Sequence, residues 1–421
     1  MTGEKNNART ALCSAFVLIS VAAFTLALTT ALLARAGMPF GAAYTAAVIA
    51  AIIGTLAVSR GGRTLLALPS PAITAWLVYE EIISRGLLWQ EALGIVAITS
   101  CLGAALMRTQ YADALRRALP SGVRTALVLG LGVTMLMTAA LYARILLPSP
   151  WALTMGGTAG DPLTYFTLMG ILLTLVLSVR GVRAALPLGM LLIALLTWAE
   201  GFWEIPAAPF LEPEAGTLVF ALTLPTNEVL SAAALGLTLL YALAVESAAI
   251  LAAQTDGAEG RRPLARLFAV SGGAALIGAF PLTIAPISLA LPEGTEERRI
   301  AEIPLTACIT ALFLLLLLPC APLVQAMADF PAVPAVALAV TGLQLLARAL
   351  HLRAGSEDFP LRGGAVTAIF LLVSYDILTG LTCALFTWTL LTAAHGERVP
   401  RRTWCLTTLL ALCILLKGIQ I

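Results

Sequence analysis

The residue with the clearest chemical potential in this chain is Glu246, a carboxylate inside a long apolar run. The run extends from Glu228 to Gln254 and exceeds the ~20 residues that one helix needs to cross the hydrocarbon core of a bilayer. A charge at that depth costs roughly 3 kcal/mol on insertion scales, so the side chain must face protein or water. We interpret Glu246, with the adjacent Ser247, as a contact for a transported solute or a proton. The alternative is a protonated, hydrogen-bonded Glu with a purely structural role.

Two other apolar segments are interrupted by proline. They read LALPSPAITAWL (66–77) and GAFPLTIAPISLALP (278–292). Paired prolines disfavour a continuous helix in either segment. Irregular backbone at membrane depth must be buried in protein or line a cavity, so both segments are candidates for the wall of a binding site.

Hydroxyl and aromatic side chains in these segments could contact a ligand. Thr74 lies in the first segment, and Thr283 and Ser288 lie in the second. Tyr79, shortly after the first segment, could stack on a planar ligand. The alternative for the hydroxyls is a hydrogen bond to their own backbone, and aromatic rings in helices often serve packing. Glu80 and Glu81 follow Tyr79, and we expect them to be solvated acids at a helix end; the alternative is a role in the vestibule of the site.

The composition defines the class of protein. The 421 residues are 60% hydrophobic and only 11% charged, whereas soluble domains average ~25% charged residues. The chain is therefore predicted to be an all-α polytopic membrane protein. The seven cysteines lie in or beside apolar runs without metal-ligand spacing. We expect no enzyme activity, no cofactor and no metal, and the net charge gives no indication of nucleic acid binding.

Apolar runs bounded by charge, Gly and Pro predict fourteen membrane spans. The first set lies near 11–34, 39–58, 66–83, 89–107, 122–144, 162–179 and 183–199, and the second near 228–254, 264–279, 278–292, 301–320, 332–349, 362–378 and 380–395. A final run, 403–419, either crosses once more or lies against the bundle. The first run is too long for a signal peptide and has no convincing cleavage site, so we expect it to be retained.

The charges in the loops agree with this count. With a cytoplasmic N-terminus, most of the 25 Lys and Arg residues fall in loops on the cytoplasmic side, as the positive-inside rule requires. An acidic, Pro-rich connector, 200–227, separates the two sets of seven and lies on the opposite side. The expected location is the cell (inner) membrane.

An odd number of spans in each set places the second set upside down relative to the first. This is the inverted-repeat plan of many secondary transporters. The Pro-interrupted segments are the third span of each set, and matched interrupted spans indicate a binding site near the midplane of the membrane.

Several stretches resemble the AzgA-like adenine/guanine/hypoxanthine permeases, within the wider nucleobase–cation symporter and nucleobase–ascorbate transporter group. The resemblance runs over nearly the whole chain. It is clearest in AAIIGTLAV (50–58), LALPSPAITAWLVYEEIISRGLLWQEALG (66–94), ALPSGVRTALVLGLGV (118–133), LLTLVLSVRGVRAALPLGMLL (172–192) and SYDILTGLTCALF (374–386).

The resemblance implies a division into a core and a gate. The core would comprise 11–107 and 228–320, and the gate 122–199 and 332–395, with the connector between the repeats and 403–419 as an additional helix. In the family the core carries the substrate, the gate makes most contacts of a homodimer, and spans 3 and 10 each contain a short extended segment beside span 8.

The resemblance carries over to the site only in part. Val245-Glu246-Ser247 stands where the family has Phe-Asp-Thr, so an acid and a hydroxyl are kept. Thr74 replaces an Asn of the third span. Ile287 stands where the tenth span of the family has a Glu that contacts substrate, so one of two acids is missing.

The sequence therefore predicts a secondary transporter of a purine-type nucleobase or a related small planar polar solute, working by elevator-like alternating access. The predicted substrate-binding residues are Glu246, Ser247, Thr74, Thr283, Ser288 and Tyr79, with Glu246 also coupling transport to protons. The alternatives are an uncoupled or anion-type carrier on the same fold and a degenerate homologue that does not transport.

Overall fold

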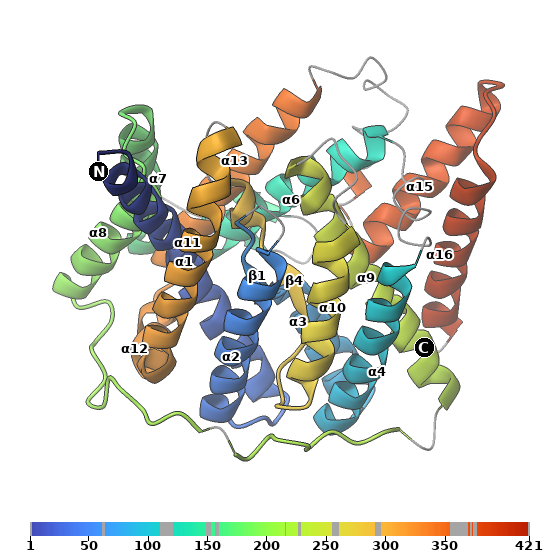
Figure 1. The fold of residues 1–421 in the computed structure, drawn as a ribbon, viewed down its shortest axis with the longest axis horizontal. Helices are drawn as coiled ribbons and strands as arrows, with labels where there is room; N and C mark the ends of the chain where they lie inside the picture. Colours follow the sequence, from blue (N-terminus) through green and yellow to red (C-terminus); the bar gives the residue numbers. More distant parts are fainter. Residues whose placement is uncertain are drawn as a thin grey trace.

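The chain forms a bundle of helices of unequal length (Figure 1). The structure, a computed structural model, describes residues 2–60, 64–109, 121–148, 153–155, 160–214, 216–225, 229–254, 261–290, 296–353, 369–370, 373 and 377–419.

The first half contains seven α-helices, one π-helix and three short strands in its described part. They are α1 (Thr2–Arg35), α2 (Phe40–Val58), β1 (Ala67–Pro69), α3 (Pro71–Trp76), the π-helix η1 (Leu77–Ser84), α4 (Trp89–Arg108), α6 (Ser121–Tyr142), β2 (Leu146–Pro148), β3 (Leu153–Met155), α7 (Pro162–Val179) and α8 (Ala185–Ala199). The short β2–β3 hairpin is a feature that the hydropathy pattern did not predict.

The second half has a similar composition. Its elements are α9 (Val229–Gln254), α10 (Arg261–Ala275), β4 (Leu282–Ile284), η3 (Pro286–Ala290), α11 (Glu296–Leu317), η4 (Leu318–Cys320), α12 (Ala321–Asp329), α13 (Ala332–Arg353), α15 (Ile377–Ala394) and α16 (Arg401–Ile419). Two of them, η3 and η4, are 3₁₀-helices.

Eight helices in the described part are long and apolar enough to cross a membrane. Two shorter apolar helices, α8 and the stretch Thr379–Ala394, match further expected spans. These observations confirm a multi-pass helical membrane protein. Most of the expected span 362–378 lies outside the described residues. The run 403–419 forms α16, which packs against α15 and α9.

Both Pro-interrupted spans contain an extended segment, and the two segments pair with each other. β1 and β4 are antiparallel, with Ala67 opposite Ile284, Leu68 opposite Thr283 and Pro69 opposite Leu282. Both strands are buried. Backbone groups in the bundle interior need partners, and each strand uses the other to satisfy part of this requirement.

Hydroxyls from neighbouring helices hold the first residue of each strand in the same way. The hydroxyl of Thr55 on α2 accepts a hydrogen bond from the Ala67 N–H at 3.2 Å, and the hydroxyl of Ser271 on α10 accepts one from the Leu282 N–H at 3.1 Å. Because α2 and α10 are the second helices of the two sets, this correspondence is the local sign of the inverted repeat.

Helix packing shows the same correspondence. α4 packs against α10, and its counterpart pair, α11 and α2, is also in contact. α6 packs against α13, which occupies the same place in the second set. Gly54 of α2 permits a close approach to the strands, because a Cβ there would lie 2.7 Å from the Leu282 side chain and 2.9 Å from the Ala67 Cβ.

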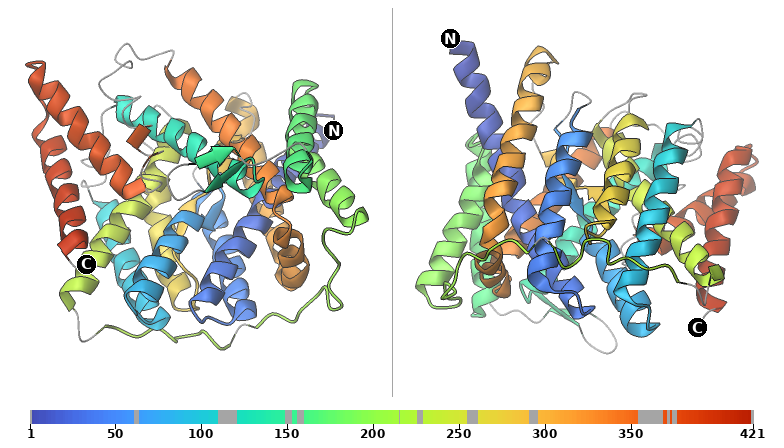
Figure 2. Two further views of the ribbon diagram at one scale, coloured as in Figure 1. Left: turned by 180° about the vertical axis from the view of Figure 1, so that it is seen from behind. Right: turned by 60° about the horizontal axis from the view of Figure 1, so that its bottom comes forward.

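The connector between the two halves runs along one end of the bundle, from α8 to α9 (Figures 1 and 2). Backbone hydrogen bonds fix it there: Leu211 donates to Pro319, Phe220 to Leu276 and Thr223 to Gln90, at 2.8–3.0 Å. The described part of the connector is thus tied to the ends of α4, α10 and the α11–η4 segment.

Candidate functional site

Glu246 lies in the interior, where α9 passes the β1–β4 pair. Its side chain is buried, with 5% of the residue exposed. The Thr283 hydroxyl of β4 donates a hydrogen bond to Glu246 Oε1 at 3.3 Å. The packing of α9 against β4 therefore brings together two of the four predicted residues from the second half of the chain, Glu246 and Thr283.

A third oxygen-bearing side chain, Ser70, comes from the first half. Ser70 is the N-cap of α3: its hydroxyl accepts from the Ile73 N–H, and Pro71 occupies the first helical turn. This pairing of Ser with Pro is a common start of a helix. The same hydroxyl lies near the Glu246 carboxyl group.

The second carboxyl oxygen of Glu246 is the unusual feature of this cluster. Glu246 Oε2 is buried and has no hydrogen-bond partner among the described residues. Leaving a buried acceptor without a partner typically costs about 1–3 kcal/mol, and more for a charged group. Natural proteins tolerate such groups mainly where a ligand, an ion or a proton completes them.

Two of the predicted hydroxyls are occupied by the backbone. The Ser247 hydroxyl accepts from the Ile284 N–H at 3.4 Å, and the Ser288 hydroxyl accepts from the Leu66 N–H at 3.0 Å. The hydroxyls of these two residues hold the broken segments beside α9 and beside each other. These two contacts are structural, and a role of Ser247 and Ser288 in binding substrate stays a prediction.

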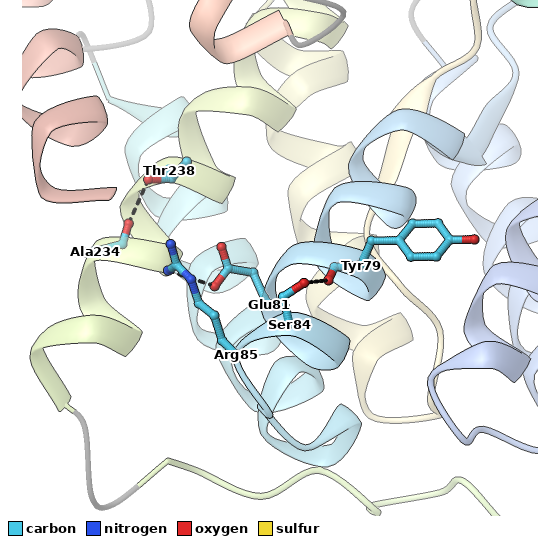
Figure 3. Close-up of polar contacts among 6 residues, drawn as sticks. All are labelled: Tyr79, Glu81, Ser84, Arg85, Ala234 and Thr238. Atoms are coloured by element: carbon cyan, nitrogen blue, oxygen red, sulfur yellow. Dashed lines mark hydrogen bonds and ion pairs between the residues drawn. The ribbon is translucent and has the colours of Figure 1, made fainter. Parts of the chain in front are cut away.

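The remaining two predicted residues differ in environment. Thr74 on α3 is buried, with 1% exposed, and its N–H donates to the Ser70 carbonyl at 2.9 Å. Tyr79 is 41% exposed and its hydroxyl pairs with Arg35 at the end of α1. The tyrosine ring extends from η1 away from Glu81, Arg85 and α9 (Figure 3), so the structure does not bring it to the Glu246 cluster.

The environment of Glu81 differs from our expectation of a solvated helix-end acid. Glu81 is buried, with 4% exposed, and forms a 3.2 Å ion pair with Arg85. Both side chains lie between η1 and α9 (Figure 3). The buried positions of this segment (Ile73, Leu77 and Glu81; Thr74, Val78 and Ile82) recur every four residues, because the wider turn of the π-helix keeps Glu81 on the packed face.

Ile287, at the position of the acid found in the family, is also buried. It is 1% exposed and belongs to an apolar cluster with Leu68 and Leu314. An apolar side chain there fits its surroundings and supplies no second carboxylate. Glu246 is therefore the acid that lies next to β4. Ile287, at the second position, is apolar.

A cavity of about 600 Å³ lies elsewhere, between the end of α6 and the beginnings of α7 and α13. Its lining includes Arg144, Asp161, Asp329, Phe202 and Phe330. None of the six predicted site residues lines it. We therefore assign the candidate site from the polar cluster around Glu246 and not from this cavity.

The sequence analysis missed Ser70 as a member of the cluster. The sequence contains a signal for this residue, because Ser followed by Pro predicts the N-cap of a helix. In the structure this cap lies between β1 and α3. That the cap would lie beside Glu246 could not be predicted, because this depends on the pairing of β1 with β4.

Curated relatives support a transporter. The chain is 28% identical to the guanine/hypoxanthine permease PbuO of Bacillus subtilis over 42% of its length and 44% of that protein. It is 28% identical to the putative permease MJ0326 of Methanocaldococcus jannaschii over 43% of this chain and 42% of that protein. It is 26% identical to the nucleobase transporter PlAzg2 of Paenibacillus larvae over 45% and 37%.

The chain is thus similar, over part of its length, to proteins named as nucleobase permeases and transporters. Each match spans less than half of the relative's own length. No family model matches the chain. These relatives are named as permeases or transporters and not as enzymes.

Solved structures support the fold independently. The transmembrane domain of a cyanobacterium bicarbonate transporter, BicA, superposes with a TM-score of 0.57 at 16% identity, over 90% of this chain and 98% of that one. The anion transporter Slc26a9 from mouse gives a TM-score of 0.51 at 10% identity, over 91% and 68%. The chain thus shares its fold with these two solved structures.

Proposed function

We propose that the protein is a secondary transporter of a purine-type nucleobase or a related small planar polar solute. The observation that carries this proposal is the buried Glu246 carboxyl group, whose Oε2 atom has no partner among the described residues where α9 meets the β1–β4 pair. The similarity to nucleobase permeases supports the same class of solute.

The chemistry of the cluster suits a ligand that has N–H groups. A carboxylate accepts hydrogen bonds, and charge-assisted bonds of this kind are among the strongest in proteins. The Thr283 hydroxyl donates its proton to the carboxyl group but keeps acceptor capacity, so it can accept from a further N–H group of the ligand. A purine presents these groups on the edge of a flat ring.

The proposal includes coupling to protons through Glu246. A proton on this carboxyl group would satisfy Oε2 when no solute is bound, and the negative charge would be available when solute enters. The helices of 11–107 and 228–320 would move as a core against the gate, 122–199 and 332–395. We further propose a homodimer in the inner membrane, with the N-terminus in the cytoplasm.

The Glu246→Gln variant tests the proposal. Gln has nearly the same volume as Glu but cannot carry charge or exchange a proton, so we expect proton-dependent nucleobase uptake to fall to background at normal expression. Glu80→Gln, on the partly exposed face of η1, is the matched control and should transport normally. Normal, pH-dependent uptake by Glu246→Gln would overturn the assignment.

A second candidate is an uncoupled or anion-type carrier. Ile287 favours it, because the absence of a second acid at this position lowers the negative charge that an anion would meet. Uptake that ignores the pH gradient and is competed by small anions but not by purines would select this alternative. A purified protein whose thermal stability responds to neither class of solute would indicate a homologue that does not transport.

A further inference from the structure

Helix α13 has two faces whose neighbours are clear. Gly342 faces α6, because a Cβ there would lie 2.8 Å from the Gly132 carbonyl oxygen. Val336 faces α7 and α8. A Cβ added to Gly170 of α7 would lie 2.5 Å from the Val336 side chain and 2.7 Å from that of Ile193 on α8.

On a third face of α13, Ala337 belongs to the same buried apolar cluster as Ala285 and Ile287 of the second broken span. α13 also packs against η3 and α9. Each residue of an α-helix turns by about 100° around the axis, so Gln344 lies about 200° around the helix from Gly342. Ala337, seven residues before Gln344, points in nearly the same direction as Gln344. Ala337 and Thr341 are buried, and Gln344 continues this face, one turn after Val340.

Gln344 has a polar atom that the described structure does not satisfy. Its Oε1 is buried without a hydrogen-bond partner among the described residues. The nearby Thr341 hydroxyl does not serve it, because that hydroxyl bonds to the Ala337 carbonyl at 2.7 Å. A buried amide oxygen in this state is destabilising unless something else binds it.

We propose that Gln344 is the gate-side contact for the transported solute. This inference rests on the proposed transport function and adds its recognition chemistry. The Gln amide has both an acceptor and donors, so it fits a lactam-type edge in which N–H and C=O groups are adjacent. Glu246 would bind one edge of the ring from the core, and Gln344 would bind another from the gate.

This arrangement defines the solute more narrowly than a single acid does. Both unsatisfied atoms, Glu246 Oε2 and Gln344 Oε1, are acceptors, so the solute should offer N–H donors on two edges. Guanine meets this condition. A ring with the same shape that lacks one N–H donor should bind more weakly to the wild type.

The Gln344→Met variant is the main test. Met has a similar length and no amide, so it removes the hydrogen bonds while keeping the packing. We expect the half-saturation concentration for guanine uptake to rise about tenfold, the effect of losing one buried hydrogen bond. The melting temperature should stay the same or rise, because an unsatisfied polar atom is removed. Gln344→Asn, which keeps a shorter amide, should recover part of the affinity.

Gln325→Met provides a matched control, because Gln325 on α12 is exposed; its kinetics should match the wild type. Preference for hypoxanthine over unsubstituted purine, which lacks the lactam N–H and carbonyl, should also shrink in Gln344→Met. If Gln344→Met transports guanine with wild-type affinity while Glu246→Gln is inactive, Gln344 has no role and the proposed function stands. If the wild type takes up no nucleobase, both proposals fail.

Discussion

The two broken spans begin alike and end differently. In each, a short strand is held at its first residue by a helix hydroxyl, from Thr55 in one and from Ser271 in the other. After β1 the chain enters a capped helix, α3, that continues into η1. After β4 it makes only the short 3₁₀-helix η3. The strand pair is thus the symmetric scaffold, whereas the segments that follow are specialised.

The difference lies in which side chains remain available for a ligand. Ser70, the cap after β1, lies beside Glu246, whereas Ala285 occupies the corresponding place after β4 and has no hydroxyl. Thr283 of β4 bonds to Glu246, whereas its partner in the sheet, Leu68, is apolar. Each broken span therefore contributes one hydroxyl to the carboxyl group, from non-equivalent positions.

The largest expected effect comes from disturbing the shared scaffold. Gly54→Val would place side-chain atoms against Leu282 and Ala67, and overpacking of this kind typically costs about 1–3 kcal/mol or more. We expect a large loss of folded protein by size-exclusion chromatography and a lower melting temperature. Gly273→Val on α10, where a Cβ meets nothing within 4 Å, should behave like the wild type.

The next effect tests whether the two strand anchors are equivalent. Thr55→Val and Ser271→Ala each remove the acceptor of a buried backbone N–H, with an expected cost of about 1–3 kcal/mol. The two variants should lower the melting temperature by similar amounts. A much larger effect of one variant would show that the two repeats are not held in the same way.

A smaller effect separates hydroxyls that hold the backbone from those that face the carboxyl group. Ser247→Ala should lower stability, because the Ile284 N–H loses its partner, while the half-saturation concentration for nucleobase uptake changes little. Thr283→Val keeps the shape but removes a contact to Glu246, so it should change uptake more than stability. The reverse pattern would contradict the roles assigned here.

The smallest expected effect concerns the cap that distinguishes the first broken span. Ser70→Ala should cost at the low end of the ~0.5–2 kcal/mol range for N-caps, because the Ser70 hydroxyl lies 3.5 Å from the Ile73 N–H. Ser70→Asp restores a cap but places a second acid beside Glu246. We expect it to be less stable than Ser70→Ala in melting experiments, and a more stable Ser70→Asp would argue against the proximity of the two groups.

Much of this architecture could be predicted from the sequence because membrane insertion is a local requirement. Long apolar runs must become helices, and paired prolines disfavour helix in two particular spans. These rules correctly located the two interrupted spans, in which β1 and β4 lie, and the depth of Glu246 in its run indicated a buried acid. The same rules misjudged Glu81, because the π-helix that turns it inward leaves no local signature in the sequence.

The sequence by itself determined which segments enter the membrane, which two of them are broken and which acid they must accommodate. The cost of burying polar groups in an apolar medium acts on each segment separately, so composition and proline spacing are sufficient. The tertiary structure decided which hydroxyls lie near Glu246, that Ser247 and Ser288 bind backbone, and that the amide oxygen of Gln344 is buried without a partner among the described residues. These outcomes depend on the pairing of segments more than 200 residues apart, which no local pattern can specify.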